Sequence, residues 1–478
     1  MTLPQIAVVG FVNAGKSSLV AALSEHGDIA IDEQGGTTRQ CHAYTCPRSG
    51  EPSLVLIDTP GFQDARHANA WMQQWQDANA GATGPDSVRA FLEAFADSGR
   101  FVNEARVLET VLTCAAGLLY VAHADRRYRT SHDAEMALLA RTGQPRMGVL
   151  NRVGKARHAE KWRDAMRSHF GKVVEIDAVH ATFAQRMDLF ASFTGLDDAW
   201  APSIRRAVAL LRGDRRAIHQ RVADALGDLL VEVLSLRVEV PFAADEPAAR
   251  ERAEERARAT ARQRIAAATT AARRSVQDAL GHERVSYAEE DRAVVAGELE
   301  LDEVWRRFGM SRLQLVRNGV VAGSLTGGAI DAAVGQISFG TGMVIGAITG
   351  GFAGFAATRD FAISAPGLPG LFGRPRRVVV LPPTSDDWPV VVLEQGLIHF
   401  EAFAGISQAA REQGLGATRI PGGGFFVHFA ADLRKAFLSA TARIARRGRK
   451  GQAIDDDLRE SLIRPIRAMV DTIDPLGD

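Results

Sequence analysis

The sequence predicts an α/β domain of mostly parallel strands with helices on both faces, followed by a mainly helical α+β half. Apolar, strand-like runs alternate with helix-forming runs up to about residue 180, and a glycine-rich turn joins the first strand to the first helix. From about residue 200 onward, helical periodicity and high helix propensity prevail instead. We expect an α/β domain over 1–195, a helical region over 196–310, a helical hairpin over 311–365 and a small α+β region over 366–478.

The composition is that of a folded protein without an overall charge. Hydrophobic residues make up 46% of the 478 positions, and 57 basic and 57 acidic side chains cancel to a formal net charge of zero. Because no global field favours a polyanion, we do not expect nucleic acid as a partner. Three cysteines in no metal-binding pattern suit a reducing compartment, and the N-terminus lacks the pattern of a secretory signal. These features predict a cytoplasmic protein.

The turn after the first strand has the spacing G-x-x-x-x-G-K-S of a phosphate-binding loop. Its glycines allow the backbone to direct N–H groups at phosphate oxygens, and the helix that follows adds its positive dipole end. Lys16 can neutralise phosphate charge, and the Ser17 hydroxyl can ligate Mg²⁺. A glycine turn that binds nothing is the alternative, but the motif is complete and has the required flanks. The residues predicted to bind nucleotide here are Gly10, Asn13, Ala14, Gly15, Lys16, Ser17 and Ser18.

Two later segments contain the other groups that a Mg²⁺–nucleotide site needs. In the segment G-G-T-T-R, the hydroxyl and carbonyl of Thr38 can complete the Mg²⁺ shell of a switch loop, with Thr37 as the second choice; a plain polar turn is the alternative. A buried-type strand then leads into D-T-P-G, where Asp58 can hold Mg²⁺ through water and Gly61 can offer its N–H to the γ-phosphate. We predict metal-site roles for Ser17, Thr38 and Asp58, and catalytic roles for Lys16, Thr38 and Gly61.

These motifs together resemble the translation-factor-like P-loop GTPases of the Era, Der and TrmE group, over roughly the first 180 residues. The resemblance is carried by G-x-x-N-x-G-K-S-S-L from Gly10, G-T-T-R from Gly36 and D-T-P-G from Asp58. It implies GTP hydrolysis with Mg²⁺, and Phe62 implies that no glutamine after D-T-P-G orients the attacking water. Some relatives instead use K⁺, bound partly by the asparagine that matches Asn13, and we carry this over as a hypothesis. The whole layout also resembles a bacterial family with a large C-terminal domain of unknown function.

Residues 63–105 make the stretch after D-T-P-G longer than this group usually has. The stretch contains two tryptophans and a helical pattern of apolar residues that includes Val88 and Phe91. We predict an enlarged second switch region there, as either a partner surface or a packed surface insertion.

The base-recognition motif of the group is incomplete in this chain. Where the group has N-K-x-D, the sequence has Asn151, Arg152, Val153 and Gly154, so the aspartate that accepts hydrogen bonds from guanine is missing. We predict that Asn151 and Arg152 bind nucleotide, and we keep ATP as an alternative to GTP because an absent carboxylate removes guanine discrimination. Asp177 follows a strand-like run in the region of the last base-contact loop, as either a base contact or a turn residue.

The second half begins with two predicted long helices. Apolar residues from Ile218 to Leu236 recur every three or four positions, and residues 248–281 are rich in arginine, glutamate and alanine, as in a helix with a solvated face. Near the C-terminus, short strands are predicted at 376–381 and 389–393, and helices near 401–412 and 428–446.

A glycine-zipper hairpin is predicted within 311–365. Its glycines recur at four-residue spacing, which places small residues on one side of a helix and allows close helix packing. Ile337–Thr358 contains no charged residue and approaches the ~20 residues that span a bilayer, whereas Asp331 would be costly in lipid. Contact with a membrane or membrane protein through 319–357, at the inner face of the cell membrane, and burial in a soluble domain are the two interpretations. The glycines are Gly319, Gly323, Gly327, Gly342, Gly346, Gly350 and Gly354.

The sequence therefore predicts a nucleotide-dependent switch that binds and hydrolyses GTP and transmits its state to a helical, membrane-associated half. Switch loops over 33–40 and 59–105 would transmit that state. The alternatives are a ribosome- or RNA-associated GTPase of the Era type, and a membrane-associated P-loop protein that uses ATP or only binds nucleotide. An oligomer is compatible with all of these.

Overall fold

The computed structural model divides the chain into two compact units, one formed mainly by Met1–Arg215 and the other mainly by Arg216–Ala404 and Leu415–Asp474. Thr37, Thr38 and the predicted glycine-zipper segment 319–357 lie outside the described residues. The structure describes residues 3–24, 40–47, 51–95, 98–242, 247–281, 362–364, 376–382, 388–404 and 425–477.

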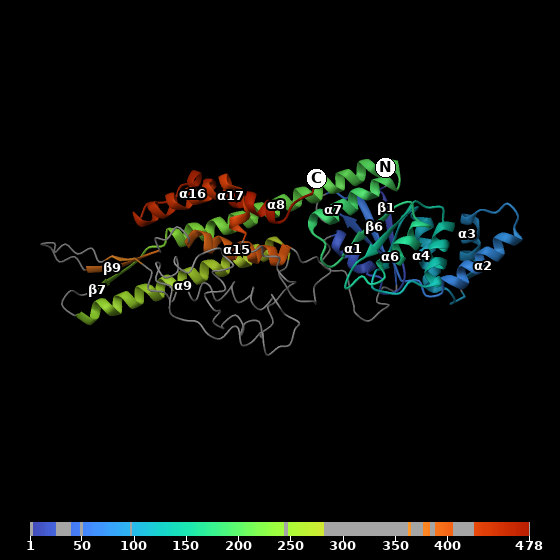
Figure 1. The fold of residues 1–478 in the computed structure, drawn as a ribbon, viewed down its shortest axis with the longest axis horizontal. Coiled ribbons are helices and arrows are strands. Elements are labelled where there is room, and N and C mark those ends of the chain that lie inside the picture. The colour runs from blue at the N-terminus through green and yellow to red at the C-terminus, as the bar shows by residue number, and fades with distance from the viewer. Residues whose placement is uncertain are drawn as a thin grey trace. The chain divides into compact units, whose positions relative to one another are not determined.

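Within the described part of the first unit, six strands form one sheet in the order β2-β3-β1-β4-β5-β6. Figure 1 labels β1 and β6 of this sheet. All neighbours pair in parallel except β2, which runs antiparallel to β3. The central strand β4 is buried over its first six residues, as expected for a parallel sheet covered on both faces. This confirms the predicted mostly parallel sheet. The strands are β1 Gln5–Val9, β2 His42–Cys46, β3 Leu54–Asp58, β4 Gly117–His123, β5 Arg146–Asn151 and β6 Val173–Ile176.

Helices cover both faces of this sheet, as predicted. Alternate residues of β1 point to opposite sides, so that Ile6 and Val8 belong to one hydrophobic cluster and Ala7 and Val9 to another. The first cluster includes residues of α1 and α7, and the second includes residues of α2 to α6. The helices are α1 Lys16–Ser24, α2 Ala65–Ala78, α3 Gly84–Phe95, α4 Val102–Thr113, α5 Thr130–Arg141, α6 Ala159–Arg167 and α7 Phe183–Ser192.

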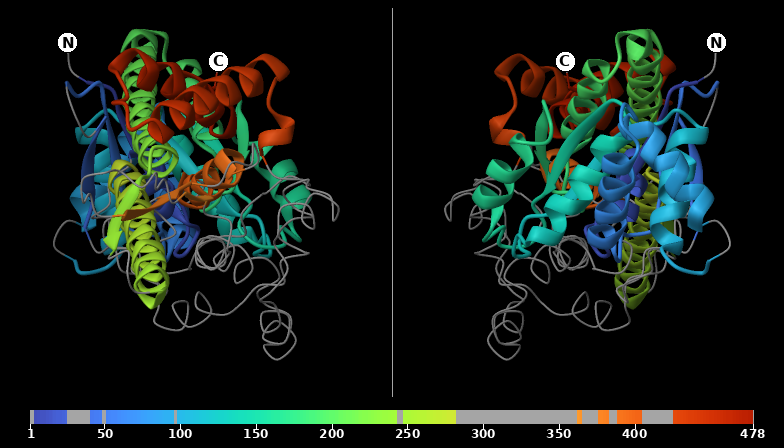
Figure 2. Two further views of the ribbon diagram at one scale, coloured as in Figure 1. Left: turned by 90° about the vertical axis from the view of Figure 1, so that its left-hand side faces the viewer. Right: turned by 90° about the vertical axis from the view of Figure 1, so that its right-hand side faces the viewer.

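The enlarged stretch after D-T-P-G is folded as α2, α3 and the start of α4, and Figure 2 shows α2 and α3 in blue in its right-hand view. Four aromatic rings hold these helices together. The centroid of the Phe91 ring lies 5.6 Å from the ring centroid of Trp71, 4.8 Å from that of Phe95 and 5.3 Å from that of Phe101. The Trp71–Phe91 pair is edge-to-face and the other two pairs are tilted, and aromatic pairs at these centroid distances are favourable. These rings belong to or pack against the hydrophobic cluster on one face of the sheet, so the stretch is a packed insertion that extends this core.

The described part of the second unit consists of long helices and a small antiparallel sheet in the order β7-β9-β8. The predicted strand at 376–381 is confirmed as β9. α8 begins in the first unit and buries its apolar positions at three- and four-residue spacing, as predicted. The elements are α8 Ala201–Leu234, β7 Val238–Phe242, α9 Pro247–Ala279, β8 Ala362–Ser364, β9 Arg376–Leu381, α15 Trp388–Ala404, α16 Ala431–Arg449 and α17 Asp456–Ile473.

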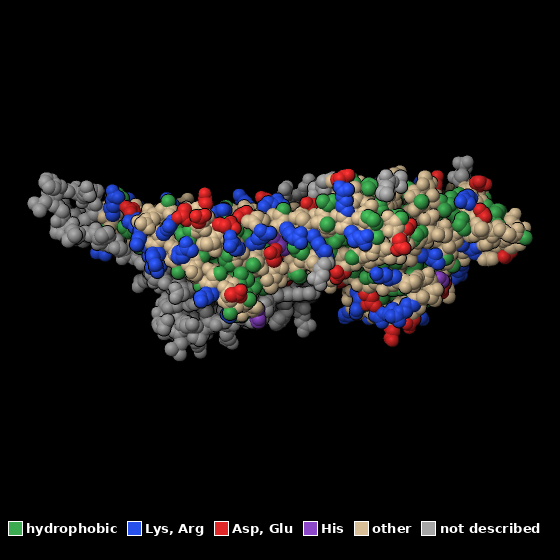
Figure 3. Space-filling model, turned by 90° about the horizontal axis from the view of Figure 1, so that it is seen from above, with side chains coloured by type: hydrophobic (Ala, Val, Ile, Leu, Met, Phe, Trp, Pro, Cys, Tyr) green, Lys and Arg blue, Asp and Glu red, His purple; other side chains and the backbone are tan. Residues whose placement is uncertain are grey.

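The arginine-rich helix α9 packs through alanines. Ala253, Ala257 and Ala261 recur at four-residue spacing and are almost completely buried, whereas Arg252 and Arg256, each one residue before a buried alanine, are exposed. The small side chains form a narrow buried stripe, and the charged residues form the predicted solvated face. In the face shown in Figure 3, Lys and Arg side chains are interspersed with Asp and Glu.

The predicted strand at 389–393 is wrong, because these residues lie in α15. Nearly every residue of α15 is buried, so the sequence shows neither the period of a strand nor that of a helix. Pro389 stands in the first turn, where its missing N–H breaks no helical bond. Burial on all sides thus overrides the strand preference of the valines. The helix predicted near 401–412 is α15 up to Ala404, and its remainder lies outside the described residues.

The helix α17 was not predicted, although its sequence contains a start signal. The Asp455 side chain accepts a hydrogen bond from the Leu458 N–H at 2.9 Å and caps the helix, but Pro465 interrupts the pattern. Its C-terminal end holds the buried His219 of α8 between two carboxylates, with Nδ1 2.6 Å from Asp471 and Nε2 2.9 Å from Asp474.

Among the described helices, none combines the length and the apolar character needed to cross a bilayer.

Candidate nucleotide-binding site

The glycine-rich loop between β1 and α1 lies in close contact with the ends of two other strands. A Cβ on Gly10 would be 2.4 Å from the carbonyl oxygen of Val121 in β4, and a Cβ on Gly15 would be 2.3 Å from Asn151 Nδ2 in β5. Gly15 and Asn13 also have positive φ angles of 91° and 59°. Glycine is favoured at position 15, because the backbone there is left-handed and a Cβ would force the Asn151 side chain to move. The loop conformation therefore depends on its motif residues.

The structure brings the predicted Lys16, Ser17 and Asp58 together at the start of α1 and the end of β3. The buried Lys16 donates from Nζ to the carbonyl oxygen of Phe11 at 3.0 Å, which curls the loop around the ammonium group. Burial lowers the pKa of Lys16 to about 8, against the opposing effect of Asp58 and Glu135. The Ser17 hydroxyl donates to Asp58 Oδ2 at 2.7 Å. A cation and two hard oxygen groups thus converge at one point.

The D-T-P-G segment passes directly over the phosphate loop. Thr59 donates from its hydroxyl to the carbonyl oxygen of Val8 at 2.7 Å, and the Phe62 N–H donates to the Gly10 carbonyl at 3.3 Å. A Cβ on Gly61 would lie 2.6 Å from the backbone of Val12, so glycine is required for this approach. The predicted Gly61 therefore lies against the phosphate loop.

Two residues of α4, which sequence reasoning missed, hold the end of this segment. The buried Glu104 accepts hydrogen bonds from the N–H groups of Gln63 and Asp64, both at 2.7 Å. Asn103 donates from Nδ2 to the carbonyl oxygen of Gly61 at 3.2 Å. Both residues belong to the enlarged stretch, and no local pattern distinguishes them from other polar residues in the first turn of a helix. The insertion is thereby connected to the predicted γ-phosphate segment.

A buried carboxyl group lies near Lys16 and was also missed. Glu135 of α5 accepts a hydrogen bond from the Tyr120 hydroxyl at 2.9 Å, and both side chains are almost completely buried. Burial raises the pKa of Glu135 to about 8, and the nearby Lys16 opposes this shift. Burial therefore disfavours the charged form of this carboxyl group beside Lys16.

Asn151 connects the phosphate loop to the segment after β6. Its Nδ2 donates to the Ala14 carbonyl at 3.4 Å, and its Oδ1 accepts from the Ala178 N–H at 3.1 Å. The predicted Arg152 instead pairs with Glu175 of β6 at 3.1 Å, and about half of its side chain is exposed. The structure therefore places Asn151, but not the Arg152 guanidinium, against the phosphate loop.

Asp177 fits the turn interpretation. Its Oδ1 accepts hydrogen bonds from the N–H groups of Val179 and His180, at 2.9 and 3.1 Å, and so closes the loop after β6. A short side chain that caps the backbone two and three residues ahead is typical of such turns.

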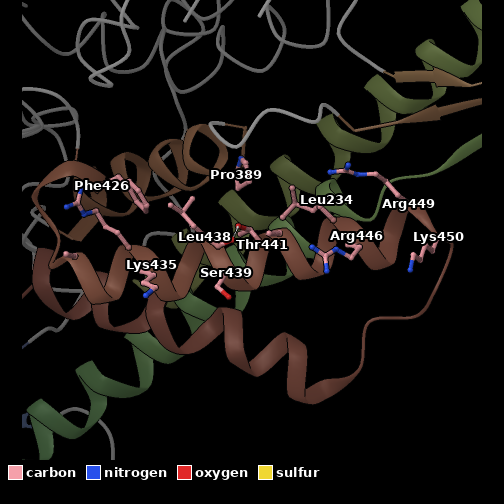
Figure 4. A pocket seen from close by; sticks show the side chains of 14 residues that line it. Leu234, Pro389, Phe426, Lys435, Leu438, Ser439, Thr441, Arg446, Arg449 and Lys450 are labelled. Carbon is pink, nitrogen blue, oxygen red and sulfur yellow. Dashed lines mark hydrogen bonds between the residues drawn. The ribbon is translucent and has the colours of Figure 1, made fainter.

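A separate groove of about 950 Å³ lies in the second unit along α16 (Figure 4). Leu234, Pro389 and Leu438 contribute apolar surface, and Arg446 and Arg449 lie toward one end. None of the residues predicted to bind nucleotide lines this groove.

Two family models match the chain. The model described as a 50S ribosome-binding GTPase matches residues 5–151, which contain the phosphate loop, D-T-P-G and Asn151. The model of a domain of unknown function, DUF3482, matches residues 163–450, more than half of the chain. The chain belongs to the DUF3482 family. It combines an Era/Der-type P-loop GTPase domain with a C-terminal DUF3482 domain, and the DUF3482 match begins within α6 of the first unit.

Several curated relatives are GTPases of the same type. GTPase Der of Xylella fastidiosa is 27% identical over 223 residues, which are 45% of this DUF3482 chain and 38% of Der. GTPase Era of Acidimicrobium ferrooxidans is 38% identical over 73 residues, or 15% and 25% of the two chains. A crystal structure of Aquifex aeolicus Era bound to GDP·AlF4⁻ matches with 18% identity and a TM-score of 0.26, over 37% of this chain and 52% of that chain. The chain thus spans about two fifths of the Der sequence that it matches.

We predict that Glu104→Ala destabilises the D-T-P-G segment more than Glu104→Gln does. Alanine leaves two N–H groups without their acceptor, which costs about 1–3 kcal/mol, whereas glutamine keeps an acceptor oxygen. Denaturant unfolding measures the loss of stability, and Glu109→Ala on the exposed face of α4 is the matched control. Equal stabilities of the Glu104→Ala and Glu109→Ala variants would contradict the role of Glu104.

Proposed function

We propose that the protein is a nucleotide-dependent switch that binds GTP with Mg²⁺ and hydrolyses it. The observation that carries this proposal is the convergence of Lys16, Ser17 and Asp58 within a complete phosphate loop. The names of the relatives, GTPase Der and GTPase Era, agree with this activity.

The chemistry of the donor set fits Mg²⁺, which prefers hard oxygen ligands. The Ser17 hydroxyl would hold the ion directly and the Asp58 carboxylate would hold it through water, with Thr38 as a third proposed ligand. When bound, Mg²⁺ supplies charge neutralisation at the β- and γ-phosphates.

The chain's own groups would stabilise the charge that develops as water attacks the γ-phosphate. Lys16 is held close to the loop backbone and can exchange its bond with Phe11 for a phosphate oxygen. Gly61 would offer its N–H to the γ-phosphate, with Asn103 and Glu104 fixing the segment around it. Positioned donors of this kind lower the barrier because they need no reorganisation during the reaction.

GTP hydrolysis with Mg²⁺ is the direct test of this function. We predict that Lys16→Ala lowers turnover by about 100-fold or more, because it removes a cation that stabilises the transition state. Lys172→Ala replaces an exposed lysine just before β6; it is the matched control and should keep the parent rate. The proposal fails if the parent protein releases phosphate no faster than Lys16→Ala does.

We further propose that K⁺ assists hydrolysis through Asn13. The residue stands in the loop with a left-handed backbone, and Phe62 follows D-T-P-G where a glutamine could have oriented water. Turnover should therefore be faster in K⁺ than in Na⁺, and Asn13→Ala should remove this difference. An equal rate in both salts, or an undiminished K⁺ effect in Asn13→Ala, would refute the role of the ion.

The proposed output of the switch is contact with a membrane or membrane protein through 319–357, at the inner face of the cell membrane. Its support is the uncharged run Ile337–Thr358 in the sequence. We predict that part of the protein sediments with cell membranes and that Val344→Lys with Ile348→Lys shifts it to the cytosolic fraction. Wholly cytosolic parent protein would contradict the proposal, and co-sedimentation with ribosomes would favour the Era-type alternative.

A further inference from the structure

We propose that Asp125, in the segment after β4, supplies the carboxylate that recognises guanine in place of the aspartate absent at position 154. This inference rests on the proposed function, because it names the base specificity of the same nucleotide site. The N-R-V-G motif has no carboxylate that could distinguish guanine from adenine, and Asp125 would supply one.

Asp125 lies beside the position where the motif has its aspartate. A Cβ built on Gly154 would meet the Asp125 carboxyl group, with Oδ2 at 3.8 Å and Cγ at 4.0 Å. The carboxylate of an aspartate at 154 would extend from that same Cβ. Asp125 thus places a carboxylate from the segment after β4 beside the location that the motif aspartate would use.

The segment that carries Asp125 is fixed to the nucleotide site, which is the second argument. The Ala124 N–H donates to the Asn151 carbonyl at 2.8 Å, and Arg126 donates from its guanidinium to the Val12 carbonyl of the phosphate loop at 3.1 Å. The Trp162 ring N–H donates to the Arg126 carbonyl at 2.8 Å. Asp125 is therefore held between the two motifs that a nucleotide would contact.

The chemistry of the carboxylate is the third argument. Guanine presents its N1–H and its 2-amino group as adjacent donors, whereas adenine has an acceptor at N1, so a carboxylate favours guanine. Arg157 pairs with Asp125, with Nε 2.8 Å from Oδ1, and holds the pKa of Asp125 at about 2. Asp125 is then an acceptor at physiological pH. Its two oxygens have about four acceptor positions, and Arg157 uses three of them, through its backbone N–H at 3.4 Å, Nε at 2.8 Å and Nη2 at 3.2 Å. A base that donates two hydrogen bonds would therefore take the free position and displace one bond from Arg157.

Asp177 is the competing carboxylate at this edge of the sheet, and it is the weaker candidate because none of its atoms lies within 4 Å of a Cβ built on Gly154. Its Oδ1 is already used by the backbone of its own loop, and its Oδ2 lies 3.1 Å from the ring of His180. Asp177→Asn is consequently a matched control, because it makes the same chemical change on a neighbouring segment.

Competition binding of GDP, xanthosine diphosphate and ADP against a fluorescent GDP tests the assignment on the full chain. Xanthine has a carbonyl oxygen where guanine has its 2-amino group, so an amide at 125 can donate to xanthine. We expect Asp125→Asn to weaken GDP binding by about 10- to 100-fold and to strengthen binding of xanthosine diphosphate. Asp177→Asn should keep the parent preference for GDP.

A second variant tests whether Asp125→Asn weakens GDP binding only because it disturbs the local structure. Asp125→Asn with Gly154→Asp restores a carboxylate next to the amide, at a φ of 81° that aspartate tolerates better than most residues. It should regain preference for GDP. The assignment is overturned if Asp125→Asn leaves the ratio of the two affinities unchanged, if Asp177→Asn changes it instead, or if the parent protein binds GDP and ADP equally. Parent protein that hydrolyses GTP in any of these cases keeps the proposed function intact.

Discussion

The phosphate loop approaches two other strands so closely that a Cβ at either of its two glycine ends would force a neighbouring group to move. Gly10 lies against the backbone of Val121, and Gly15 lies against the Asn151 side chain. The contact of Gly10 with Val121 follows from the parallel pairing of β1 with β4, and β3 lies on the other side of β1. Because the strands run in parallel, their carboxyl ends place Asp58 on one side of the loop and the segment with Asp125 on the other. The site is a consequence of this arrangement.

Buried ionisable groups make the site costly to form and responsive to an anion. Lys16 is buried with a lowered pKa, and the pKa of nearby Glu135 is raised, so burial disfavours the charged form of each. An anionic phosphate would stabilise the ammonium form of Lys16 and offset part of this cost. Glu104 contributes differently, because it satisfies two backbone N–H groups at the point where the insertion meets D-T-P-G.

Local patterns in the sequence predicted the loop, the D-T-P-G segment and the strands that carry them, because each depends on consecutive residues. Glu104 and Asp125 could not be found in this way, since their importance arises from contacts with segments 29 or more residues away. The strand predicted at 389–393 failed for another reason. Its apolar run is buried on all sides in α15, and a run without polar positions has no readable period. Position 154 has glycine in place of the motif aspartate, and only the folded structure shows that the Asp125 carboxylate lies beside it.

A crystal structure of the protein with Mg²⁺ and a non-hydrolysable GTP analogue would test the central claim most directly. The account predicts that the Ser17 hydroxyl turns from Asp58 to the metal ion and that Lys16 Nζ leaves the Phe11 carbonyl for a phosphate oxygen. A nucleotide bound in the loop with both of these hydrogen bonds unchanged, or bound elsewhere on the chain, would contradict it.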